Sequence, residues 1–129
     1  MDATEIISLI GVYDADGTVI GEVTYWLGAR IGRAHCALCE VTHGLFTERD
    51  SWRRWRRSLP VPFELFHRDD APSEVLAMVD ALPTVVARTA DGLVELMGRS
   101  ALEECSGELA TFVDSLDRAL RDRGLRLAD

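Results

Sequence analysis

Apolar residues recur along this chain in short segments that have the length and spacing of β-strands. Four segments show this strand pattern: residues 6–13, 63–67, 84–88 and 93–97. The first is a continuous β-branched apolar run, which predicts a buried strand. The last two flank Asp91-Gly92, a dipeptide typical of tight hairpin turns, so we expect these two strands to pair antiparallel.

Between the strands, the spacing of apolar residues favours helices. Five stretches have helical spacing or end at helix-stopping residues: residues 19–27, 34–46, 49–58, a segment beginning near 73, and 101–123. The sequence Leu-Pro-Val-Pro at 59–62 ends the third of these stretches. Ser73 or Asp70 is expected to cap the fourth, and Gly124 is expected to end the fifth.

The apolar residues of the last two predicted helices share one face in each case. The inward-facing positions are expected to be Val75, Leu76 and Val79 in the fourth helix, and Leu102, Leu109, Phe112, Val113, Leu116 and Leu120 in the fifth. The fifth is expected to be one continuous helix. Cys105, which lies within it, is expected to be a small buried residue.

A chain of 129 residues is long enough for one domain with its own hydrophobic core. No apolar run approaches the roughly 18–20 residues that a membrane-spanning helix needs. The first five residues carry two acids where a signal peptide carries basic residues, which favours a cytoplasmic protein. A stable structural disulfide is unusual in that compartment.

The net charge of −8 argues against general binding of nucleic acid or of anionic membranes. All 14 basic residues are arginine, a bias that we attribute to a GC-rich bacterial genome. Because the chain contains no lysine, it has neither a lysine Schiff base nor the lysine-containing phosphate loop of the nucleotide-binding enzymes.

The strongest chemical signal is the segment 35–43, which holds two of the three cysteines and two of the three histidines. In a helix, Cys36, Cys39 and His43 stand at positions i, i+3 and i+7 and therefore project from one face. Two thiols and an imidazole on one face suit either a metal site or a redox dithiol. The spacing alone leaves both open, and two buried thiols without a chemical role are the third alternative.

In the metal hypothesis, Cys36, Cys39 and His43 are ligands, and His35 replaces His43 or orients a ligand from outside the metal shell. The fourth ligand is then His67, Glu40 or water. Two thiolates with one or two imidazoles favour zinc, with copper(I) or iron as alternatives. This hypothesis predicts a small metal-binding protein.

In the redox hypothesis, the chain is a thiol–disulfide oxidoreductase that needs no metal. Cys36 is then the nucleophile, because the helix dipole acts more strongly on the first cysteine of such a pair. His35 or His43 tunes its pKa, and Cys39 resolves the mixed disulfide. A disulfide between these cysteines requires the pair to lie in the first turn of a helix.

The order of elements resembles that of the thioredoxin-like fold, through the dithiol pair Cys36 and Cys39 and the sequence Leu82-Pro83-Thr84 at the start of the third core strand. In that fold the peptide bond before this proline is cis. The resemblance implies that Pro83 is cis and lies near the dithiol site. It implies an α/β domain over 1–129, with a central mixed sheet of about four strands flanked by helices.

About twenty residues separate the first predicted strand from Cys36, whereas the dithiol of thioredoxin-like enzymes follows that strand almost directly. We therefore expect an extra helical insertion after the first strand.

The segment Trp52–Arg57 reads Trp-Arg-Arg-Trp-Arg-Arg. Its two tryptophans are expected to face the core, with the arginines as a solvated basic edge. Because guanidinium groups bind carboxylates and phosphates in a fork geometry, the same segment is also a candidate surface for an acidic protein partner. An interaction module with structural cysteines is therefore a third functional hypothesis.

Overall fold

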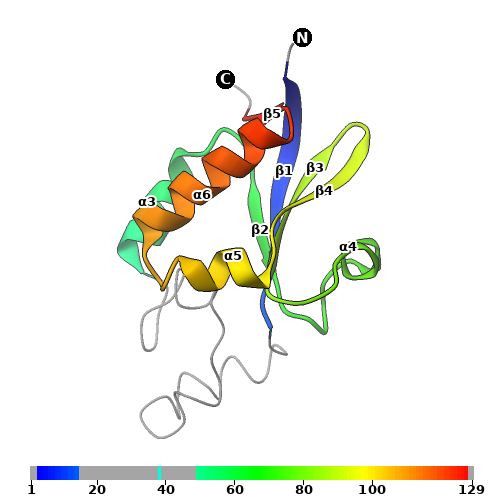
Figure 1. Cartoon of the computed structure of the whole chain (residues 1–129), viewed down its shortest axis with the longest axis horizontal. Helices are drawn as coiled ribbons and strands as arrows, with labels where there is room; N and C mark the ends of the chain where they lie inside the picture. Colours follow the sequence, from blue (N-terminus) through cyan, green and yellow to red (C-terminus); the bar gives the residue numbers. More distant parts are fainter. Residues whose placement is uncertain (1–2, 15–37, 39–48, 128–129) are drawn as a thin grey trace, which may run out of the picture.

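The computed structural model describes residues 3–14, residue 38 and residues 49–127. These residues form a mixed α/β fold in which helices flank a five-stranded mixed sheet (Figure 1). The predicted helices at 19–27 and 34–46, and with them the expected insertion after the first strand, lie outside the described residues, except that Leu38 is helical.

The sheet has the strand order β2-β1-β3-β4, and β5 pairs separately with β1. The strands are β1 (Thr4–Val12), β2 (Phe63–Phe66), β3 (Thr84–Thr89), β4 (Gly92–Met97) and β5 (Leu125–Arg126). β1 runs parallel to β2 and antiparallel to β3, and β3 runs antiparallel to β4. The four predicted strands are confirmed; β5, which pairs with the first residues of β1, was not expected.

The hairpin between β3 and β4 forms at the predicted turn. Gly92 has a φ of +131°, a conformation that favours glycine over residues with a Cβ atom. The hydroxyl of Thr89 accepts a hydrogen bond from the amide of Asp91 and donates one to the carbonyl of Gly92. The turn residues therefore have local partners for their polar groups.

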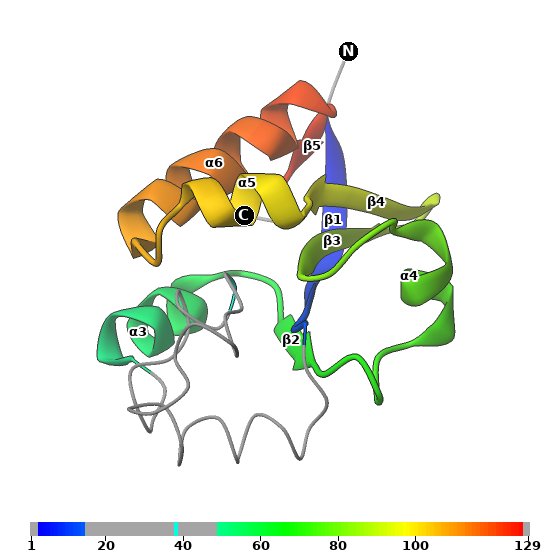
Figure 2. The same cartoon turned by 60° about the horizontal axis from the view of Figure 1, so that its bottom comes forward.

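Within residues 3–14 and 49–127, three helices cover one face of the sheet and one short helix covers the other (Figures 1 and 2). The helices are α3 (Asp50–Ser58), α4 (Ser73–Met78), α5 (Arg99–Glu104) and α6 (Leu109–Asp122). Residues of α3, α5 and α6 join the larger core cluster, whereas Val75 of α4 joins a smaller cluster on the opposite face.

Aromatic rings form the centre of the larger cluster. The Trp52 ring meets the rings of Phe63 and Phe112 edge to face, with centroid separations of 5.1 and 6.1 Å. Trp55 packs against the same two phenylalanines. The prediction that both tryptophans face the core is confirmed, and their packing fixes the rotation of α3 about its axis.

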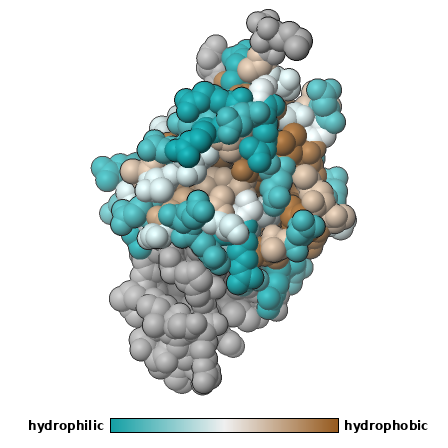
Figure 3. Space-filling view, in the orientation of Figure 1, coloured by the Kyte–Doolittle hydropathy of each residue, from teal (hydrophilic) through white to brown (hydrophobic). Residues whose placement is uncertain are grey.

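The smaller cluster is aliphatic. Ile10, Val12 and Val86 of the sheet are buried beneath Val75 of α4. Figure 3 shows hydrophilic residues over α6 and hydrophobic residues gathered on the side where α4 and the β3–β4 hairpin lie in Figure 1. Met78 of α4 is one of two large hydrophobic residues that are exposed in the described part of the chain.

The expectation of one continuous helix over 101–123 is wrong, because the chain forms α5 and α6 with a break between them. Ser106 and Gly107 have φ values of +51° and +75°, which a right-handed helix does not accommodate. The buried positions were nevertheless correct: Leu102, Phe112, Leu116 and Leu120 are buried, and Leu109 and Val113 pack against them. Gly124, with a φ of +67°, follows α6 as expected.

The predicted cap of α4 is also wrong. Pro72 occupies the N-cap position, and no side chain caps the helix. Asp70 does not reach the helix, because its carboxylate accepts a hydrogen bond from the backbone amide of His67. Val75 is buried as predicted, and Leu76 and Val79 pack at its side.

None of the helices in residues 3–14, 38 and 49–127 is long and apolar enough to cross a bilayer.

Candidate functional site

The carboxyl ends of β1 and β2 lie side by side and bring several candidate residues together. The register pairs Gly11 with Leu65 and Val12 with Phe66, so the residues that follow each strand leave the sheet at the same end. Ligands of α/β proteins commonly bind beyond the carboxyl ends of parallel strands. This end of the sheet is therefore the natural place to search for a site.

The predicted cluster itself, which comprises Cys36, Cys39, His35, His43 and Glu40, lies outside the described residues. Between its two cysteines, Leu38 is described: it is helical, fully buried and part of the larger core cluster. The structure therefore shows where the chain between the cysteines meets the core.

Leu38 packs where β1 has no side chain. The Leu38 Cδ2 atom lies 3.2 Å from the point at which a Cβ atom on Gly11 would stand, and Leu65 Cδ2 lies 2.9 Å from the same point. Phe63 Cε1 completes this contact at 3.1 Å. Because residue 11 is a glycine, the side chains of Leu38 and Leu65 can meet beside it. This contact lies one residue before the end of β1.

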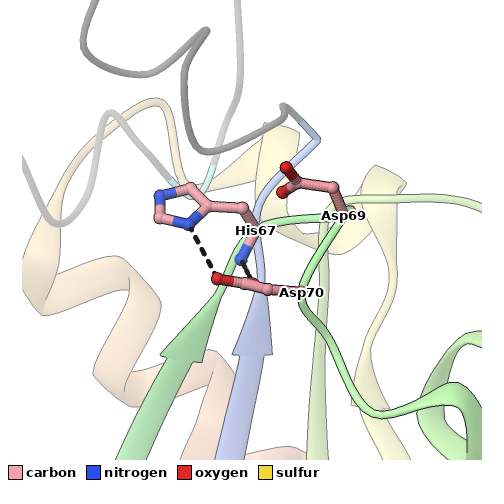
Figure 4. Close-up of side chains that lie close together, drawn as sticks. All are labelled: His67, Asp69 and Asp70. Atoms are coloured by element: carbon pink, nitrogen blue, oxygen red, sulfur yellow. Dashed lines mark hydrogen bonds and ion pairs between the residues drawn. The ribbon is translucent and has the colours of Figure 1, made fainter.

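His67 follows the last residue of β2 and is held from two sides (Figure 4). Its Nδ1 atom lies 3.5 Å from a carboxylate oxygen of Asp70, whose other oxygen accepts a 2.6 Å hydrogen bond from the His67 amide. The imidazole also packs on the buried ring of Tyr13, at 5.6 Å between centroids. These contacts fix the ring and direct Nε2 away from Asp70.

Asp69 joins His67 and Asp70 in a group whose ligand atoms all lie within 4.8 Å of one another. The imidazole is half-buried and both carboxylates are exposed. Only His67 was predicted to be a candidate, but the sequence His-Arg-Asp-Asp directly after a predicted strand was a signal for the whole group. An imidazole and two carboxylates can bind a divalent cation.

An ion pair joins the two chain segments that leave the sheet at this end. Arg68, next to His67, lies 3.7 Å from the carboxylate of Asp14, which follows β1. Both side chains are partly exposed, so the pair contributes at most about 1 kcal/mol. Its main effect is to hold the residues after β1 and β2 against each other.

Pro83 precedes β3 at the same end of the sheet. The register pairs Thr84 with Val12, so buried Pro83 lies next to the point where β1 ends. The Leu82–Pro83 peptide bond is cis, which confirms this prediction. The position of Pro83 relative to Cys36 and Cys39 falls outside the described residues.

Cys105 is the third cysteine and stands at the carboxyl end of α5. Its side chain is buried, and its thiol donates a 3.4 Å hydrogen bond to the carbonyl of Ala101. Burial raises the pKa of the Cys105 thiol, the charge of Glu104 adds to the increase, and a hydrogen bond with Ser115 opposes it. A neutral buried thiol of this kind is a structural residue, as the sequence predicted.

Comparisons of the chain with protein-family models, with curated proteins and with solved structures found no match.

Proposed function

We propose that this chain is a small metal-binding protein, with zinc as the metal and with Cys36, Cys39, His43 and His67 as its ligands. The observation that supports this ligand set is the burial of Leu38 beside Gly11, at the sheet end where His67 follows β2. Leu38 directly precedes Cys39 in the chain, so its position supports a ligand set that includes a residue at this end of the sheet.

The chemistry of the donors favours zinc. Two thiolates and two imidazoles form a common tetrahedral zinc site, and copper(I) or iron are the alternatives for the same donors. Asp70 contributes from outside the metal shell, because a carboxylate on Nδ1 fixes the tautomer in which Nε2 is free to bind. His35 is the alternative to His43, and Glu40 or water is the alternative to His67.

A thiol–disulfide oxidoreductase is the second candidate, and the position of Pro83 favours it. A thioredoxin-like fold places a proline beside the dithiol, and here Pro83 lies next to the end of β1. The order of elements and the mixed sheet support a thioredoxin-like relationship, which we propose for the fold as a whole. In this candidate Cys36 attacks and Cys39 resolves the mixed disulfide. We propose a cytoplasmic location in both cases.

Metal content and thiol state, measured on one preparation of untagged protein, separate the two candidates. Zinc binding predicts about one metal ion per chain, lost in Cys36→Ser and in Cys39→Ser. Cys105→Ala is the matched control and is expected to keep its metal, because Cys105 is buried after α5. A metal-free protein with a reversible Cys36–Cys39 disulfide would instead establish the redox candidate.

His67→Phe tests the fourth ligand. Phenylalanine keeps an aromatic ring against Tyr13 but has no nitrogen to bind a metal. Loss of an outer carboxylate lowers metal affinity by roughly 10-fold. Loss of a direct ligand in His67→Phe is expected to lower the zinc affinity by more than that. Unchanged affinity in His67→Phe would assign the fourth position to Glu40 or water.

Asp70→Asn tests the outer carboxylate, with Asp69→Asn as the control for loss of the same charge one residue away. The carboxylate of Asp70 lies 3.5 Å from Nδ1 of His67. We expect about 10-fold weaker zinc binding in Asp70→Asn and a smaller change in Asp69→Asn. Equal changes in both would mean that the carboxylates act only through their charge.

A further inference from the structure

Helix α3 presents a basic flank that the packing of the fold does not require. Five of the 14 arginines lie between residues 49 and 57, in a chain whose net charge is −8. Trp52 and Trp55 are turned into the core, so the rotation of the helix is fixed. At about 100° per residue, Arg53, Arg56 and Arg57 then fall along one side of it.

This flank forms one wall of an open depression with a volume of about 640 Å³. Arg53, Arg56 and Arg57 line one wall, and the segment 59–64 that leads from α3 into β2 lines the other. Figure 2 shows α3 and β2 joined by this short segment. Pro60 and Pro62 are exposed in it, so the second wall offers apolar surface beside the guanidinium groups.

The charges in this depression are unbalanced. Among the described residues that line it, Glu64 is the one acidic residue. Arg53 pairs with Asp50 on the same helix, whereas Arg57 has no ion-pair partner among residues 3–14, 38 and 49–127. The lining of the depression therefore has an excess of positive charge.

The packing of the core does not require these arginines. Like charges at i, i+3 and i, i+4, as in Arg53 with Arg56 and Arg53 with Arg57, repel one another by about 0.2–0.5 kcal/mol for each pair. The position of Arg56 and Arg57 in the last turn of α3, where the helix dipole favours basic residues, offsets this repulsion. The helix therefore holds the three arginines together on its surface, where a cluster of guanidinium groups is available to bind anionic groups.

We propose that this depression binds an acidic peptide segment of a partner protein. Glutamate or aspartate side chains of the peptide pair with Arg53, Arg56 and Arg57, since a guanidinium group binds a carboxylate through two parallel hydrogen bonds. An apolar side chain of the same peptide packs on the proline-containing wall formed by residues 59–62. A long polyanion such as nucleic acid is disfavoured, because the rest of the chain is acidic and repels it.

The test uses the full chain and a fluorescein-labelled peptide of repeated Glu-Glu-Leu sequence, with fluorescence anisotropy as the readout. Saturable binding that weakens as salt is raised is expected. Arg57→Glu is expected to weaken binding at least about 10-fold, which corresponds to loss of one charge-assisted contact. Arg54→Glu is the matched control: Arg54 is exposed on the same helix and does not line the depression.

Three outcomes would overturn the proposed binding of an acidic peptide by these arginines. They are no saturable binding of the peptide, equal loss of affinity in Arg57→Glu and Arg54→Glu, and tighter binding of a single-stranded oligonucleotide than of the peptide.

A peptide in which serine replaces leucine tests the apolar wall and is expected to bind more weakly. Equal binding of the two peptides would overturn the contribution of that wall. Arg57→Gln, a milder change, repeats the test if Arg57→Glu lowers the unfolding temperature. Metal content should be the same in all these variants, because none of the substituted arginines is a proposed zinc ligand.

Discussion

The two faces of the sheet are packed very differently. On one face α3, α5 and α6 enclose a cluster whose centre is the interlocking rings of Trp52, Phe63 and Phe112. On the other face, in the part of the chain that the structure describes, one six-residue helix covers Ile10, Val12 and Val86. Burial of apolar surface is the main source of folding free energy, so the three-helix face supplies most of it. Leu38 packs on that face, which ties the proposed zinc site to the better-packed side of the protein.

The largest expected effect comes from truncating a residue at the centre of the three-helix face. Phe112→Ala should lower the free energy of unfolding by about 3–5 kcal/mol, because it opens a cavity among aromatic rings. Val86→Ala is the counterpart on the other face and should cost about 2 kcal/mol. Urea unfolding of both variants measures the difference. A larger loss in Val86→Ala would reverse the comparison of the two faces.

The second prediction concerns the contact between Leu38 and β1. Gly11→Ala places a methyl group 2.9 Å from Leu65 Cδ2 and 3.2 Å from Leu38 Cδ2, so one of these side chains must move. We expect a loss of about 1–3 kcal/mol in stability, together with weaker zinc binding if Leu38 is displaced.

The control for this effect is Gly98→Ala. Its nearest neighbour would be a Glu95 oxygen at 3.7 Å, an ordinary contact distance, so it should leave both measurements nearly unchanged. A stable Gly11→Ala protein with normal metal affinity would show that Leu38 is not needed to position the site.

The third prediction uses the buried thiol of the three-helix face. Because burial raises the pKa of Cys105 above its usual value of 9.0, the folded protein holds its proton at a pH where the unfolded chain has lost it. The associated stability is present below pH 9.0 and is lost as the pH rises above it. Urea unfolding at rising pH should therefore show that the native protein loses stability relative to Cys105→Ala. Parallel curves for the two proteins would mean that the thiol does not ionise on unfolding.

The smallest expected effect lies on the α4 face. Ser8 is buried there, and its hydroxyl has no hydrogen-bond partner among the described residues, unlike the hydroxyls of Thr84 and Thr89. Removing an unsatisfied hydroxyl relieves its desolvation penalty, so Ser8→Ala should raise stability by up to about 1 kcal/mol. Thr84→Val is the contrasting control: it removes the donor of a 2.6 Å hydrogen bond to Glu95 and should be destabilising. If Ser8→Ala is also destabilising, the hydroxyl is satisfied in solution.

The strands and most buried positions could be predicted because they depend on local patterns. The alternation over 63–67 and the Asp91-Gly92 turn are visible within a few residues, and both appear in the structure. The break between α5 and α6 was missed because the apolar stripe continues in phase on both sides of it. Gly107 was the local signal for this break, and its positive φ is what ends the helical path.

Two kinds of feature could not be predicted from local patterns: pairings between distant residues, and hydrogen bonds for which neighbouring groups compete. β5 consists of two residues that pair with Thr4 and Glu5, more than a hundred positions earlier in the chain. Asp70 was expected to cap α4, but its carboxylate instead accepts a hydrogen bond from the backbone amide of His67. At the site, His67 was identified as a ligand candidate, whereas the contact between the Asp70 carboxylate and its imidazole was not predicted. The sequence His-Arg-Asp-Asp after a predicted strand was the local signal for this group.

The pairing of β5 with β1 sets the geometry of any fusion protein made with this chain. Thr4 and Leu125 are neighbours in adjacent parallel strands, so the polypeptide enters and leaves the domain at one pole (Figure 1). The ends of β1 and β2, where His67 and Pro83 lie, form the other pole. A fluorescent reporter or an affinity handle attached at either terminus would therefore stand clear of the candidate zinc ligand His67.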